Sequence, residues 1–212
     1  TTGALLLVVP LGNTGFLGIA ATRALLSEDH VALALTYDQL GTFLLLVTYG
    51  TVIASRYGTA ESGALVMVRK VVTFPPFIAL VASIALRHWK LSESANDILS
   101  AVGKTVSYCA MLALGLRFRL AVTRKLAGPA AIGIATRMLV VPALVVLVAV
   151  FAGDAHSISW EATQLQAAMP PMIVAGLLAA SSGLNAEAST FVVGTGTILS
   201  FATLPIAAAL IK

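Results

Sequence analysis

The sequence has few charged residues, which make up 10% of its 212 positions. A soluble domain carries about 25%, so this chain has too few charges to cover a surface that faces water. The apolar residues, 58% of the chain, fall in long blocks, and most are close to the roughly 20 residues that a helix needs to cross a bilayer. The composition therefore predicts an integral membrane protein.

Cysteine is almost absent, and this excludes several kinds of site. Cys109 stands alone inside an apolar block, so it forms no internal disulfide and has no metal-ligand neighbour. His30, His88 and His156 lie at connections without the spacing of a metal site, and we expect them to be solvated. The apolar blocks contain no nucleophile with a base and no metal cluster. We therefore expect no enzyme, cofactor or bound metal.

The apolar blocks number seven, and short connections join them, so neighbouring helices should be antiparallel. They cover residues 3–26, 31–54, 71–87, 95–116, 127–152, 162–181 and 188–211. The fold class that follows is an all-α helix bundle.

The net charge of +4 does not indicate a nucleic-acid partner, because the basic residues follow a topological pattern. They gather in the connection 55–70 and in the one before residue 127: Arg56, Arg69, Lys70, Arg117, Arg119, Arg124 and Lys125. The positive-inside rule places both connections in the cytoplasm. The prediction is a multi-pass protein of the cell (inner) membrane, with the C-terminus outside and an odd number of spans before Thr1.

Two of the blocks carry helix breakers deep inside the apolar run. The first reads Pro10-Leu11-Gly12-Asn13-Thr14-Gly15, and the second reads Met169-Pro170-Pro171-Met172. Proline removes a backbone donor and clashes with the preceding turn, and glycine is a poor helix former. Unwound backbone at membrane depth must be buried or line a wet cavity. We predict two broken helices; the alternative is a pair of ordinary proline kinks.

The two breaks have matching surroundings. Asn13 is followed 28 residues later by Gly41, and Pro170 is followed 26 residues later by Gly196. Each break leads through a half-helix and a polar turn into one further span. Inverted repeats produce such pairs, and their half-helix N-termini meet near the midplane, aimed at an anionic group. Residues 71–212 then form one five-helix repeat, 1–54 the last two helices of the other, and 55–70 their connection.

The motifs also resemble one family of membrane transporters in order along almost the whole chain. The segment Gly12–Gly18 is similar to the first broken-helix motif of the auxin efflux carrier family, and Ala167–Pro171 to the second. Phe74-Pro75-Pro76 and Leu114-Gly115-Leu116 resemble two further motifs. The resemblance implies ten helices in two inverted repeats, of which this chain holds helices four to ten. It also implies transport of organic anions and allows a homodimer.

Two departures favour a bacterial type over the plant carriers. Gly12 precedes Asn13 where plant members have a longer Asn-Pro-Asn motif, and the connection 55–70 is short.

We expect the substrate site at the breaks. Asn13 is the first candidate, because its amide both donates and accepts and so suits a carboxylate or freed backbone; the alternative is a purely structural cap. The expected substrate-binding residues are Asn13, Thr14, Gly15, Gln166, Met169, Pro170 and Pro171.

Three charged residues lie deep inside apolar blocks, away from the block ends: Asp38, Lys104 and Arg137. A charge at membrane depth is costly and is a functional hypothesis by default. We expect these residues to serve proton or ion coupling, with Lys104 or Arg137 pairing with Asp38 or attracting an anion. The alternatives are a structural role for Asp38 and snorkelling of Arg137 toward the cytoplasm.

The function predicted is secondary active transport of a small organic anion by alternating access, driven by protons or by the membrane potential. A sodium-coupled carrier of the bile acid type is the alternative with a similar architecture. A seven-helix receptor is disfavoured, because it requires an outside N-terminus.

Overall fold

The computed structural model describes residues 1–59, 92–102 and 124–211, with scattered positions 73, 78, 81, 82, 84–86, 105 and 112. Most of the predicted segments 71–87 and 95–116, including Lys104 and Cys109, lies outside the described residues. The chain divides into two compact units, 1–60 with 117–212 and 61–116. In the second unit, residues 93–102 are helical; the rest of the description concerns the first unit.

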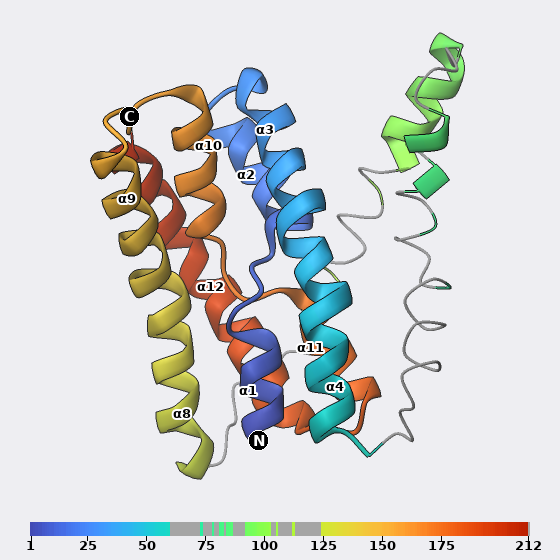
Figure 1. Cartoon of the computed structure of the whole chain (residues 1–212), viewed down its shortest axis with the longest axis vertical. Helices are drawn as coiled ribbons and strands as arrows, with labels where there is room; N and C mark the ends of the chain where they lie inside the picture. The colour runs from blue at the N-terminus through green and yellow to red at the C-terminus, as the bar shows by residue number, and fades with distance from the viewer. Residues whose placement is uncertain are drawn as a thin grey trace. The chain divides into compact units, whose positions relative to one another are not determined.

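Every regular element in the described parts is helical (Figure 1). The α-helices are α1 Thr2–Val8, α2 Ile19–Leu25, α3 Val31–Thr36, α4 Thr51–Tyr57, α8 Arg124–Ala135, α9 Val141–Phe151, α10 Ile158–Ala167, α11 Ile173–Ser181 and α12 Ala186–Ile211. Wider π-helical turns occupy Thr14–Gly18, Tyr37–Phe43, Leu46–Gly50 and Thr136–Val140, and a 3₁₀ turn occupies Glu28–His30.

Three helical stretches are long and apolar enough to cross a membrane. They run over Glu28–Tyr57, Lys125–Phe151 and Ala186–Ile211. Each begins and ends within about three residues of the predicted segments 31–54, 127–152 and 188–211, as expected for boundaries read from apolar blocks. The membrane-helix prediction is confirmed for these segments by length and composition.

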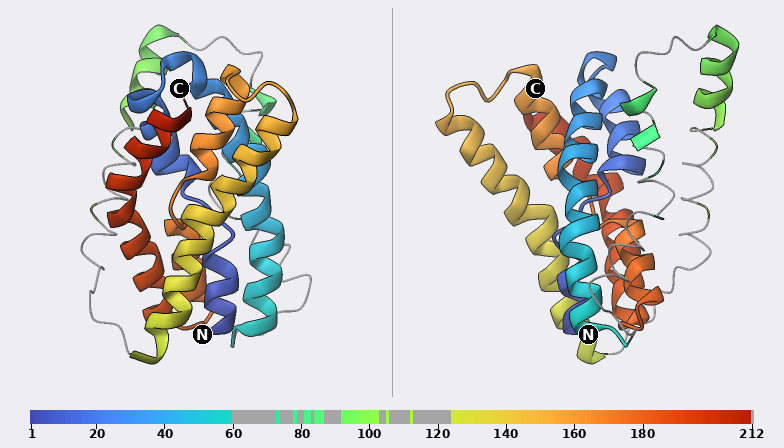
Figure 2. Two further views of the ribbon diagram at one scale, coloured as in Figure 1. Left: turned by 90° about the vertical axis from the view of Figure 1, so that its left-hand side faces the viewer. Right: turned by 45° about the vertical axis from the view of Figure 1, so that its right-hand side comes forward.

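The two segments with breakers are interrupted, as predicted. Helix α1 ends at Val8, and helical structure resumes at Thr14 in a π turn that leads into α2. Helix α10 ends at Ala167 and α11 begins at Ile173. Figures 1 and 2 show the two irregular stretches passing close to each other in the middle of the unit.

Small residues allow the helices around the crossing to approach closely. A Cβ atom on Gly196 of α12 would lie 2.6 Å from Cδ of Pro171, and one on Gly3 of α1 would collide with the Tyr57 side chain. Membrane helices use glycine and alanine in this way because lipid provides no hydrophobic drive for association. In Figure 1 the two chain ends lie at opposite ends of the unit.

Gly196 provides a test of this packing. Gly196→Ala should lower the thermal unfolding temperature of the detergent-solubilised protein, because the proline ring cannot move aside; overpacking costs about 1–3 kcal/mol. Gly128→Ala is the matched helical control, since a Cβ there meets nothing within 4 Å. Equal unfolding temperatures for the two variants would contradict the close packing.

Candidate functional site at the crossing of the broken helices

The two breaks supply each other's missing backbone partners. Gly12 and Pro171 form an antiparallel bridge. The Asn13 amide donates to the Pro170 carbonyl at 2.7 Å, and the Met172 amide donates to the Leu11 carbonyl at 2.8 Å. Buried backbone groups need such partners, and the need is greatest in lipid, where unpaired groups cost several kcal/mol. The breaks are therefore stable only as a pair.

Arg137 ties the two breaks together from the side. Its Nε donates to the Met169 carbonyl at 3.0 Å and its Nη1 donates to the Pro10 carbonyl at 3.2 Å. Its Nη2 lies over Gly12, where a Cβ atom would collide with the guanidinium. Glycine at this position is thus required by the close approach of the arginine.

The position of Arg137 matches the dipoles of the half-helices. Pro10 follows the carbonyl end of α1, and Met169 follows the carbonyl end of α10. A cation near helix carbonyl ends is stabilising by about 0.3–2 kcal/mol. The two carbonyls accept two of the five guanidinium N–H groups without neutralising the charge. Arg137 is only 4% exposed and forms no ion pair with any described residue.

Asp38 lies beside the N-terminal, amide end of a half-helix, whereas Arg137 lies at carbonyl ends. Thr14 donates its hydroxyl to Asp38 Oδ1 at 2.6 Å, and Gln39 donates its side-chain amide to Oδ2 at 2.9 Å. A Cβ atom on Gly15 would lie 3.1 Å from both carboxylate oxygens. The carboxylate thus faces the first turn of the half-helix that starts at Thr14, where a negative charge is favoured.

Two buried amide oxygens near the crossing have no hydrogen-bond donor in the described part of the chain. They are Asn13 Oδ1 and Gln166 Oε1, on side chains 1% and 0% exposed. Gln166 donates through Nε2 to the Thr22 hydroxyl at 3.2 Å, and its Oε1 presses against Gly18. Buried acceptors are normally satisfied, so an orphaned one at a site is a place for a donor from outside the chain.

The profile of the family described as membrane transport protein matches residues 1–208. The chain belongs to this family, that of the auxin efflux carriers. An uncharacterized transporter from Methanothermobacter thermautotrophicus is 26% identical over 97% of this chain and 67% of its own length. An uncharacterized transporter from Methanocaldococcus jannaschii is 31% identical over 54% of this chain. No solved structure matches the chain.

The match covers 67% of the length of the first relative and 38% of the length of the second. The name of neither relative specifies a substrate. The family assigns membrane transport, which is a non-enzymatic class. The auxin-efflux-carrier resemblance read from the sequence motifs is confirmed by this match.

Most of the site residues predicted from the sequence of this transporter-family protein lie together at the crossing. Asn13, Met169, Pro170 and Pro171 lie in the two breaks, and all are buried. Thr14 and Gly15 begin the half-helix and contact Asp38, while Gln166 faces the next turn at Gly18. Asp38 does not pair with Arg137; each finds neutral hydrogen-bond partners instead. Lys104 lies outside the described residues.

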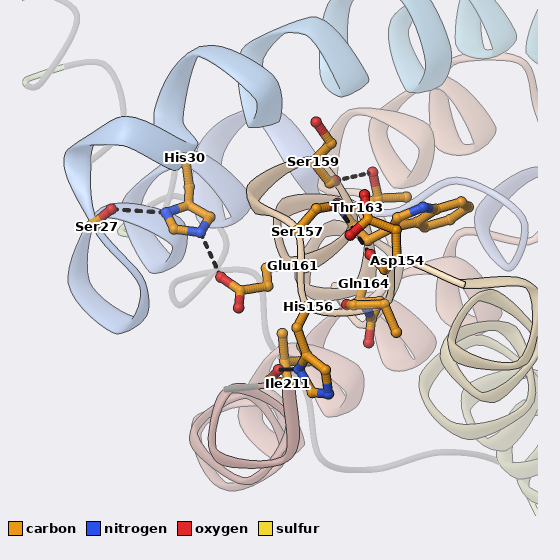
Figure 3. Close-up of polar contacts among 12 residues, drawn as sticks. Ser27, His30, Asp154, His156, Ser157, Ser159, Glu161, Thr163, Gln164 and Ile211 are labelled. Carbon is orange, nitrogen blue, oxygen red and sulfur yellow. Dashed lines mark hydrogen bonds and ion pairs between the residues drawn. The ribbon is translucent and has the colours of Figure 1, made fainter. Parts of the chain in front are cut away.

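One expectation about the connections is wrong. His30 is buried rather than solvated: its Nε2 lies 2.8 Å from Glu161 Oε2 and its Nδ1 lies 2.8 Å from Ser27 Oγ. Figure 3 shows the imidazole between these partners. The contact joins the α2–α3 connection to the first turn of α10. His156 is exposed, as expected, and its Nδ1 lies 3.0 Å from the Ile211 carbonyl.

The π turns are the feature that sequence reasoning missed. Thr14, Asp38 and Arg137 each lie in one of them. Such turns are rare and occur frequently at functional sites. Their amino-acid composition does not differ from that of an ordinary apolar helix, so the sequence does not predict them. The one indication is an ionisable residue inside a long apolar segment.

Arg137→Lys tests the tie between the breaks. Lysine keeps the charge but cannot reach both carbonyls with a planar fork, so the unfolding free energy should fall by about 2 kcal/mol, the range for charge-assisted hydrogen bonds. Lys125→Arg, the reverse exchange at an exposed position of α8, is the control and should leave stability unchanged. Two equal, small effects would show that the carbonyl contacts carry no stability.

Proposed function

We propose that this protein is a secondary active transporter of a small organic anion that works by alternating access. The proposal specifies the substrate class and mechanism of the membrane transport that the family assigns. The observation that carries it is a buried cation without an anionic partner among the described residues, Arg137, held at the crossing of two interrupted helices.

An unpaired buried charge is costly, and a protein retains one where function uses it. Two carbonyls hold Arg137 in place and leave its charge uncancelled, so an entering anion gains the full attraction. Guanidinium also suits the planar geometry of a carboxylate. This favours a carboxylate substrate over a neutral solute or a cation.

The substrate-binding residues proposed are those that surround the crossing. Asn13, Thr14 and Gly15 form one wall, and Gln166, Met169, Pro170 and Pro171 form the other. The orphaned oxygens of Asn13 and Gln166 accept from a hydroxyl or N–H group where the substrate carries one beside its carboxylate. The prolines leave irregular backbone without competing amide donors.

Alternating access requires one part of the protein to move. Both breaks and the residues that tie them together belong to the same compact unit, residues 1–60 with 117–212. We propose that one helix bundle that includes both breaks moves against the rest of the protein, so that the crossing faces each side of the membrane in turn. The presence of two similar breaks supports the proposal that the two broken segments are equivalent elements of two inverted five-helix repeats.

The proposed setting is the cell (inner) membrane with the C-terminus outside, on the charge pattern of the connections. The partners are the anion and the surrounding lipid, with a homodimer as the assembly that the family resemblance allows. A proton or the membrane potential drives transport in this proposal.

Asn13→Ala should abolish most uptake in proteoliposomes, because the orphaned acceptor and its amide donor are lost together. The full-length protein is reconstituted and uptake of labelled acetate, benzoate, lactate and succinate is measured with and without a pH gradient. Asn96→Ala, at an exposed asparagine, is the control and should transport at the unaltered rate.

Unchanged uptake by Asn13→Ala would remove Asn13 from the site. Transport that requires a sodium gradient and ignores pH and potential would favour the bile-acid-type alternative. Uptake of none of the anions by the unaltered protein would contradict the proposed substrate class.

A further inference from the structure

Among the described residues of the first unit, Asp38 and Arg137 are the buried acidic and basic side chains of opposite sign, and the two are not paired. Asp38 is 5% exposed and Arg137 is 4% exposed. Asp38 accepts from Thr14 and Gln39, whereas Arg137 donates to Pro10 and Met169. Neither forms an ion pair within residues 1–59 and 124–211. The sum of these two charges in the empty unit is zero.

Anion binding at Arg137 disturbs this balance. The substrate neutralises the guanidinium and leaves the Asp38 carboxylate as a net buried negative charge. An uncompensated buried charge costs several kcal/mol, and this cost opposes movement of the loaded unit through the membrane. One proton on Asp38 restores a sum of zero, since the site then holds a cation, an anion and a neutral acid.

We infer that Asp38 takes up one proton for each carboxylate bound at Arg137, so that the charges of these two residues and the bound anion sum to zero in both the loaded and the empty state. Transport is then a proton–anion symport of equal stoichiometry. The inference rests on the proposed function and specifies its coupling. The proton comes from the aqueous phase on the side of entry, binds a carboxylate oxygen of Asp38 and is released on the other side.

The hydrogen-bond geometry accommodates the proton. The Thr14 hydroxyl lies 2.6 Å from Asp38 Oδ1 and 3.5 Å from the Gly12 carbonyl. With Asp38 ionised, Thr14 donates to the carboxylate. With Asp38 protonated, the acid donates to Thr14, whose own proton turns to Gly12. A hydroxyl performs this exchange because it both donates and accepts.

The groups around Asp38 leave it as the titrating residue. The π turn that contains Asp38 packs against Thr14–Gly18, α3 and Leu46–Gly50, and none of these segments carries an acidic or basic side chain. The other titratable groups are tyrosines: Tyr37 directly precedes Asp38 in the chain, and Tyr49 donates to the Leu6 carbonyl at 2.8 Å. No charged side chain of the packed segments competes for the proton.

Isothermal titration calorimetry of the full-length protein in detergent measures the linked proton. Acetate, benzoate and lactate are titrated at one pH in buffers of different ionisation enthalpy, and the slope gives the protons taken up. We expect about one proton per bound monocarboxylate, and an affinity that falls about tenfold per pH unit where the empty site is ionised. Zero uptake with measurable binding would overturn the inference.

The variant Asp38→Asn separates anion binding from proton uptake. The amide keeps the shape and is permanently neutral, so anion binding should occur with zero proton uptake and an affinity independent of pH. The same uptake in this variant as in the unaltered protein would assign the proton elsewhere and overturn the inference. Binding of no anion by the unaltered protein would contradict the proposed function, which is a different result from binding without proton uptake.

Thr14 offers a matched pair of variants. Thr14→Val removes the hydroxyl at constant volume and should shift the pH midpoint of anion binding by one unit or more, whereas Thr14→Ser keeps the hydroxyl and should leave the midpoint in place. Equal midpoints for the two variants would remove the Thr14 exchange from the coupling. Thermal unfolding of each variant establishes that it is folded.

Discussion

Unwound backbone inside a membrane requires partners, because lipid offers no hydrogen bonds. This chain interrupts two helices and satisfies one break with the other, through the amides of Asn13 and Met172 and the bridge at Gly12 and Pro171. The rest of the unit depends on these hydrogen bonds between the two breaks. Gly196 lets α12 approach the proline ring, and Arg137 donates to two further carbonyls of the breaks, those of Pro10 and Met169.

The two interrupted helices also determine where the buried charges lie. Interrupted helices expose carbonyl ends and amide ends in mid-unit, and these attract opposite charges. Arg137 lies at the carbonyl ends and Asp38 lies beside the amide end, so the two interruptions create one cationic and one anionic position. A continuous helix provides neither. The transport proposal and its proton coupling both follow from that asymmetry.

Much of this was predictable from sequence, for identifiable reasons. Proline and glycine mark the breaks locally, and long apolar runs mark the spans, so both were confirmed. Partner choice depends on three-dimensional placement and was not predictable: Arg137 pairs with carbonyls rather than Asp38, and His30 is buried against Glu161, 131 residues away. The inverted repeat and the substrate stay predictions, since neither family membership nor the described residues test them.

Native-state amide hydrogen exchange, resolved to single residues, tests the central claim most directly. Asn13 and Met172 lie in irregular backbone, where amides ordinarily exchange fast. Because each donates across the crossing, we predict that both exchange as slowly as amides in the middle of α12, and that Arg137→Lys accelerates them together. Exchange of either amide at the rate of the exposed turn around Gly153 would contradict a crossing held by mutual hydrogen bonds.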